Sequence, residues 1–150
     1  MSRRIAVSVA AGVVVLAGAG AYALAYAGEQ PPALTHSTAR YSAPAGDRDG
    51  SLSFTTDVTA SSGIKSVKVL AWPATSSLTK QKLTAKDMAA AESAVCTPAG
   101  KHTVHCTYTT TVTPTDAASS PHGAWHIAVL AEATNGTTTL DNKAAGFTVR

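Results

Sequence analysis

Residues 51–73, SLSFTTDVTASSGIKSVKVLAWP, contain the pattern that decides the fold class of this chain. Two sets of residues recur there at every second position between polar neighbours: Leu52, Phe54, Thr56 and Val58, then Val67, Val69 and Ala71. Such alternation is typical of a strand with one buried face. The short Ser/Gly turn between the two sets predicts that the two strands are adjacent antiparallel neighbours.

Further strands are predicted on both sides of this segment. Residues 103–113, TVHCTYTTTVT, alternate most clearly of all. Near the end of the chain, a strand through Trp125, Ile127 and Val129 is followed by Asn135-Gly136, a strong hairpin signal, and by a returning strand. A first short strand is expected from Thr38 to Pro44. The predicted core holds these residues: Phe54, Val67, Val69, Tyr108, Trp125, Ile127 and Val129.

Residues 77–95, SLTKQKLTAKDMAAAESAV, lack β alternation and are rich in Ala, Lys, Glu and Met. These residues favour helix, so a helix is predicted here, most firmly over residues 85–94. The later stretch 114–123, PTDAASSPHG, predicts a turn or a single helical turn with Thr115 or Asp116 as its cap.

The first residues are typical of a secretory signal. Arg3 and Arg4 precede an apolar run that ends in Ala25-Tyr26-Ala27, the small-residue motif of signal-peptidase sites. Cleavage is expected after Ala27, with Ala23 as a second candidate. The alternative is an uncleaved membrane anchor, because an apolar run of about 20 residues can also span a bilayer.

The expected organisation is therefore a signal helix (1–27), a Pro-containing linker (28–37) and one domain (38–150). Most of the excess positive charge leaves with the signal, so the domain is close to neutral. The predicted fold class is all-β: an immunoglobulin-like or fibronectin-like β-sandwich with one inserted helix.

A family resemblance supports this fold. Residues 57–73 resemble the region from strand B to strand C of bacterial immunoglobulin-like and fibronectin-like modules, and residues 123–149 resemble their final hairpin. From about Thr38 to Val149 the chain is similar to small secreted proteins of streptomycete-type actinobacteria whose domain has no assigned function. The resemblance implies a fold and no activity. It places Trp72 where immunoglobulin domains carry a strand C tryptophan.

Residues 96–106, CTPAGKHTVHC, hold both cysteines and two of the five histidines, so they predict either a metal site or a stapled turn. An exported chain with two cysteines favours a Cys96–Cys106 disulfide. If 103–112 is a strand, His105 and Cys106 face opposite sides of the sheet and cannot both bind one ion. We therefore expect no metal and no cofactor here.

Other candidates for chemistry are weaker. The nucleophile elbow, the H-E-x-x-H motif and the Gly-rich phosphate loops are missing from the sequence. Asp47 and Asp49 resemble half a calcium loop but are expected to form a plain turn. His122 and His126 lie too far apart on a strand to share a metal. Trp125 could be an exposed ligand platform, although its apolar neighbours favour a core position.

Two function classes follow. The favoured one is a secreted, non-enzymatic module that binds an extracellular or envelope protein or glycan through loops and sheet faces. The alternative is a secreted protease inhibitor, with residues 96–106 as the stapled loop, or a small hydrolase. Nucleic-acid binding is not expected, because the densest basic group, Lys80, Lys82 and Lys86, is small and typical of a solvated face. Membrane contact is expected only through an uncleaved signal segment.

Overall fold

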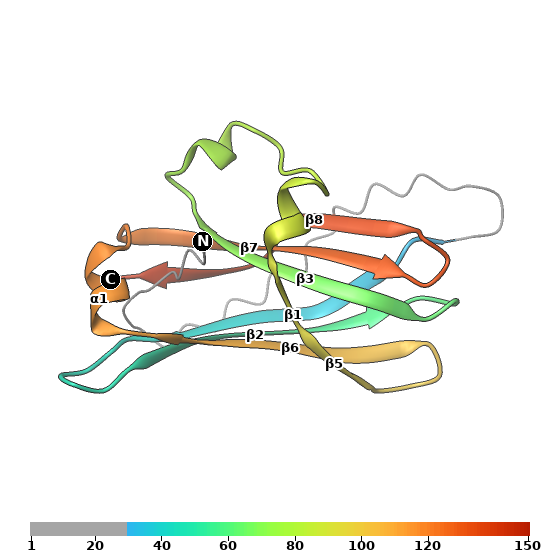
Figure 1. Ribbon diagram of the computed structural model, residues 1–150, viewed down its shortest axis with the longest axis horizontal. Helices are drawn as coiled ribbons and strands as arrows, with labels where there is room; N and C mark the ends of the chain where they lie inside the picture. The colour runs from blue at the N-terminus through green and yellow to red at the C-terminus, as the bar shows by residue number, and fades with distance from the viewer. Residues whose placement is uncertain (1–29) are drawn as a thin grey trace.

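The structure is a computed structural model that describes residues 30–150; the expected signal peptide and its cleavage sites lie outside the described residues. Two antiparallel four-stranded sheets pack against each other (Figure 1). One sheet has the order β1-β2-β6-β5, with β1 Ala33–Ser42, β2 Gly50–Thr59, β5 Val95–Pro98 and β6 Thr103–Val112. The other has the order β4-β3-β7-β8, with β3 Ile64–Pro73, β4 Glu92–Ser93, β7 Gly123–Ala133 and β8 Thr138–Val149. The predicted all-β sandwich is confirmed.

The core lies between the two sheets and is built from the alternating residues of each strand. Every predicted core residue is buried there except Tyr108, which is half-buried. Trp125 is 3% exposed, stacks on Phe147 at a centroid distance of 5.9 Å and donates its indole N–H to the Pro121 carbonyl at 3.0 Å. Its side chain therefore belongs to the core and is no exposed platform.

The strands β2 and β3 are not neighbours, so the predicted pairing is wrong. β2 pairs with β1 and β6, whereas β3 pairs with β4 and β7. The connecting turn crosses from one sheet to the other: Ala60 N–H donates to the His102 carbonyl of the first sheet's hairpin, and the Gly63 carbonyl accepts from Thr134 of the second. Alternation identifies a strand's buried face but does not identify its partner.

The helix predicted over 77–95 is also absent from this segment. Its residues form two 3₁₀ turns, Ser77–Thr79 and Asp87–Ala90, followed by β4 and β5. We call residues 74–91 the cover segment, because Leu83 and Met88 are buried with Trp72 and Ala128 on the outer face of the β3–β7–β8 sheet. Contacts with the sheet therefore override helix propensity.

Within residues 30–150 the one α-helix is α1, Pro114–Ser119, where a turn or single helical turn was predicted. Its N-cap is Thr113, whose side chain accepts from Asp116 N–H at 3.1 Å, and the Asp116 carboxylate accepts from Thr113 N–H at 3.3 Å. This reciprocal pair is a capping box. Asp116 thus takes part in the cap from the third helical position, and Thr115 does not act as the cap.

The first strand begins at Ala33 rather than near Thr38, so half of the expected linker lies in the sheet. Pro32 is fully buried and its carbonyl accepts from the Thr139 hydroxyl of β8. The pairing of β1 with β2 shifts between Thr35 and Thr38, which marks a β-bulge. Because the residues of this bulge are polar, this part of the strand lacks the apolar–polar alternation that predicts a strand.

Candidate functional site

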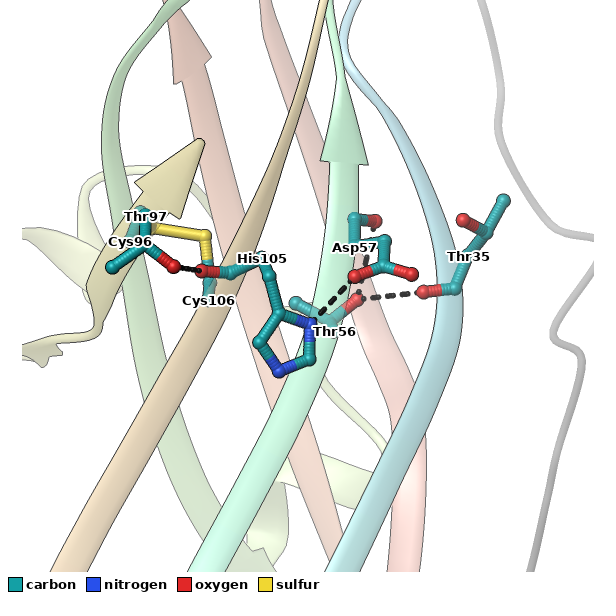
Figure 2. Close-up of a disulfide and its surroundings, with 7 residues drawn as sticks. All are labelled: Thr35, Thr56, Asp57, Cys96, Thr97, His105 and Cys106. Carbon is teal, nitrogen blue, oxygen red and sulfur yellow. Dashed lines mark hydrogen bonds and ion pairs between the residues drawn. A yellow bond between two sulfur atoms is a disulfide. The ribbon is translucent and has the colours of Figure 1, made fainter. Parts of the chain in front are cut away.

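The hairpin of β5 and β6 contains a disulfide between Cys96 and Cys106 (Figure 2). The two residues lie directly opposite each other in the strand register. Cys106 is completely buried, whereas the neighbouring His105 is exposed on the other side of β6. The stretch that suggested either a metal site or a staple is therefore a staple.

The tip of this hairpin bears on the inhibitor alternative. Strand pairing continues to Pro98 and Val104, and Ala99 N–H donates to the Thr103 carbonyl, so only residues 99–102 project, in a bend. Substrate-like inhibition relies on an extended segment adding to the protease as a strand. The bend at the tip does not offer that geometry; of the two extended strands of this hairpin, β5 is the edge strand of the sheet.

An unpredicted polar cluster lies beside the hairpin, on the outer face of the first sheet. Asp57 of β2 accepts hydrogen bonds from the imidazoles on both sides: His105 Nδ1 lies 2.7 Å from Oδ1 and His36 Nδ1 lies 3.1 Å from Oδ2. The hydrogen bond from His105 holds the pKa of the Asp57 carboxyl below its usual value; burial opposes this effect, and the hydrogen bond from His36 adds to the lowering by a smaller amount than burial opposes it. Because an ionised carboxylate only accepts hydrogen bonds, Nδ1 of each imidazole is the donor in these contacts.

The bulge in β1 places His36 in this cluster. His36 has a φ of 53°, a left-handed conformation that is uncommon for residues other than glycine. From the core side, the Thr56 hydroxyl donates to the Thr35 carbonyl at 3.2 Å (Figure 2). The same hydroxyl lies 2.8 Å from the Ser37 hydroxyl. Thr56, on the core-facing side of the sheet, and Asp57, on its outer side, therefore both form hydrogen bonds to the bulge.

The outer face of the first sheet is rich in hydroxyl groups, and we call it the hydroxyl face. Cross-strand rows are formed by Thr38, Thr55 and Thr107, by Arg40, Ser53 and Thr109, and by Ser42, Ser51 and Thr111. The next row is the Asp57 cluster, which consists of His36, Asp57 and His105. Strand β5 adds Val95 and Thr97 to the same face. None of these outward side chains is buried, so no part of residues 30–150 covers this face.

The other sheet differs, because the cover segment lies over part of its outer face (Figure 1) and packs there on Trp72 and Ala128. Trp72 therefore points away from the sandwich core, unlike the strand C tryptophan to which it was compared. Its indole N–H donates to the Asn142 carbonyl at 3.1 Å and its ring lies 4.7 Å from that of His126. Burial, with a smaller effect of Lys143, lowers the pKa of His126.

The fold does not bring the other candidate site residues, the two histidines around β7 and the two aspartates after β1, together in one site. His122 lies in the exposed turn before β7, away from the Trp72–His126 contact, and Asp47 and Asp49 lie in the exposed turn after β1. Among residues 30–150, no group of three His, Cys, Asp or Glu side chains is placed to hold a metal ion. In the same part of the chain, no helix has the length and apolar character needed to cross a bilayer.

Comparison with known proteins gives one match. A family model described as a family of unknown function, DUF5707, matches residues 34–131, which run from β1 into β7. No curated protein and no solved structure matches the chain.

Proposed function

The chain belongs to the DUF5707 family, and we propose that it is a secreted, non-enzymatic module that binds an extracellular or cell-envelope partner through its hydroxyl face. The observation that carries the proposal is the difference between the two sheets. The cover segment packs on part of one outer face, at Trp72 and Ala128, whereas residues 30–150 leave the hydroxyl face open. Binding surfaces on sandwich folds are built on such rigid faces and on the loops beside them.

Two finer parts of the proposal concern lineage and location. The strand orders β1-β2-β6-β5 and β4-β3-β7-β8 correspond to the A-B-E-D and C′-C-F-G orders of immunoglobulin-like sandwiches, which supports an immunoglobulin-like domain. The actinobacterial lineage rests on the sequence resemblance alone. The Cys96–Cys106 disulfide supports export, because disulfides persist in oxidising compartments.

The same geometry favours a binding module over a protease inhibitor. The tip of the stapled hairpin is a bend tied to the turn after β2 by the hydrogen bond from Ala60 N–H to the His102 carbonyl, and the disulfide fixes β5 in the sheet that carries the hydroxyl face. We therefore infer that the disulfide serves to hold β5 in the sheet that forms the hydroxyl face.

The test is capture of envelope material by the exported protein. Thr107→Arg places a long cation in the middle of the hydroxyl face, and Thr148→Arg places the same residue on the exposed outer side of β8 as a matched control. Wild type and Thr148→Arg should retain the same material, and Thr107→Arg should retain about tenfold less. Equal retention by all three proteins would place the binding surface elsewhere.

A further inference from the structure

We propose that the hydroxyl face binds an uncharged polysaccharide; this inference rests on the proposed function and names the chemical class of the ligand. It is carried by three features of the face: the near absence of charge, the ordered hydroxyl rows and a carboxylate held in one position by two imidazoles.

The charge distribution is uneven over the residues described. Apart from the two histidines, only Arg40 and Asp57 carry a formal charge among the outward residues of the hydroxyl rows and the Asp57 cluster. The lysines of residues 30–150 lie elsewhere: Lys65, Lys68, Lys80, Lys82, Lys86, Lys101 and Lys143. Charged partners are selected by surfaces of complementary potential. A face with so little charge does not match a nucleic acid, a polyuronate or a strongly charged protein patch.

The hydroxyl rows match a ligand that is itself a polyol. Each hydroxyl supplies one donor and two acceptor lone pairs, which is the capacity of a sugar hydroxyl. Thr38 and Thr55 already share one bond, at 2.9 Å, which leaves further lone pairs for a ligand. Neighbouring strands are spaced by about 4.8 Å, so the rows form a regular grid on which a linear polymer can repeat the same contacts. Beyond Thr107 in its row, Val95 is 72% exposed and offers an apolar contact to the C–H groups of a sugar ring.

Asp57 supplies the one strong acceptor on the face. Its side chain is 27% exposed, so a ligand can reach the carboxylate. The two histidines use one lone pair on each oxygen, and an ionised carboxylate has about four acceptor sites. The remaining sites can accept from two neighbouring sugar hydroxyls, and the histidines fix the carboxylate's orientation before the ligand arrives. Asp57 is therefore assigned as the residue that orients the polysaccharide on the grid.

The experiment is retention of the exported protein on insoluble cellulose, on chitin and on a gel containing soluble α-glucan, with a polyuronate gel as the charged comparison. The test variant is Thr38→Val/Thr55→Val/Thr107→Val, which removes hydroxyls but keeps side-chain shape and β-branching. The matched control is Thr148→Val, and the urea midpoint of each variant verifies its fold. A second variant, Asp57→Asn, tests the orienting carboxylate without changing the rows.

We expect wild type to be retained by at least one uncharged polysaccharide, with little change up to about 0.5 M salt. The triple variant and Asp57→Asn should each lose about tenfold in affinity, and Thr148→Val should bind as wild type does. The inference would be overturned if wild type were retained by none of the uncharged polysaccharides, or only by the polyuronate in a salt-sensitive manner. It would also be overturned if the triple variant were retained as strongly as wild type. If wild type instead captures an envelope protein in a manner abolished by Thr107→Arg, the polysaccharide inference fails and the binding function stands. If the protein binds neither an uncharged polysaccharide nor an envelope protein, both the polysaccharide inference and the proposed binding function fail.

Discussion

Asp57 Oδ1 lies 2.7 Å from His105 Nδ1 across the β2–β6 pair, although the two residues are separated by 48 positions in the chain. The hydrogen bond fixes a carboxylate at the open face of a sheet, and a second imidazole, that of His36, completes the arrangement. Polar groups held in this way on a rigid sheet are pre-organised for a ligand.

The Asp57 cluster predicts an acid-dependent loss of stability. The fold lowers the pKa of Asp57 below the unfolded-chain value of about 3.9, so the stabilisation is complete above that pH and is lost as pH falls through the folded pKa. Asp57→Asn should therefore unfold more easily than wild type at pH 7 and lose less stability on acidification. Urea unfolding at neutral and acid pH measures both, and Asp47→Asn, in an exposed turn, should keep the wild-type profile. Identical profiles for Asp57→Asn and wild type would contradict this account.

The Cys96–Cys106 staple predicts a moderate effect of reduction. Closing a loop of this size stabilises a fold by about 2 to 3 kcal/mol in the chain-entropy model. Reduction should release the end of β5 from β6 and lower the melting temperature, while the rest of the sandwich, to whose core β5 contributes only the partly buried Cys96, remains folded. Thermal unfolding with and without reductant measures the change. Thiol titration of the denatured, unreduced protein should find close to no free thiol; two titratable thiols would disprove the staple.

Trp125 predicts a large stability effect at a single position. Its ring is 3% exposed and packs on Phe147, so Trp125→Ala should cost about 3 to 5 kcal/mol. Val95→Ala, at a side chain that is 72% exposed, should change the unfolding free energy by less than about 0.5 kcal/mol. Denaturant unfolding of both variants provides the comparison. A Trp125→Ala variant as stable as wild type would remove Trp125 from the core.

The N-terminal pattern predicts export and cleavage. Arg3 and Arg4, the apolar run and Ala25-Tyr26-Ala27 lead us to expect a mature chain that begins at Gly28. Mass spectrometry of the culture supernatant gives the first residue directly. Full-length protein found only in the membrane fraction would instead support the uncleaved anchor.

Strands with strong alternation were predictable, but their partners were not. β2, β3, β6 and β7 follow from residues such as Phe54 and Ile127, and Asn135-Gly136 correctly predicted the β7–β8 hairpin. The sheet to which each strand belongs depends on contacts of the connecting turns, as between Ala60 and His102, which no local pattern contains. The helix prediction for the cover segment is wrong because Leu83 and Met88 are buried with Ala128 of the distant strand β7, a contact that helix propensity does not include.

The His36–Asp57–His105 cluster was missed for a similar reason. Asp57 and His105 each occupy an outward position of a predicted strand, and knowledge of the β2–β6 pairing would have brought them together. His36 would still have been missed, because the bulge that turns it toward Asp57 depends on the buried Thr56 hydroxyl.

The most direct test of the binding face is an NMR titration of the exported protein, labelled with ¹³C at its threonine methyl groups, with the polysaccharide fraction of the envelope. Threonines occur on the hydroxyl face, as at Thr38, Thr55, Thr107 and Thr109, and also away from it, as at Thr134 and Thr148. The account predicts that the signals of the first four residues shift or broaden on addition, while those of Thr134 and Thr148 stay unchanged. Perturbation confined to Thr134, in the β7–β8 turn, or to Thr148, on the other sheet, would contradict it.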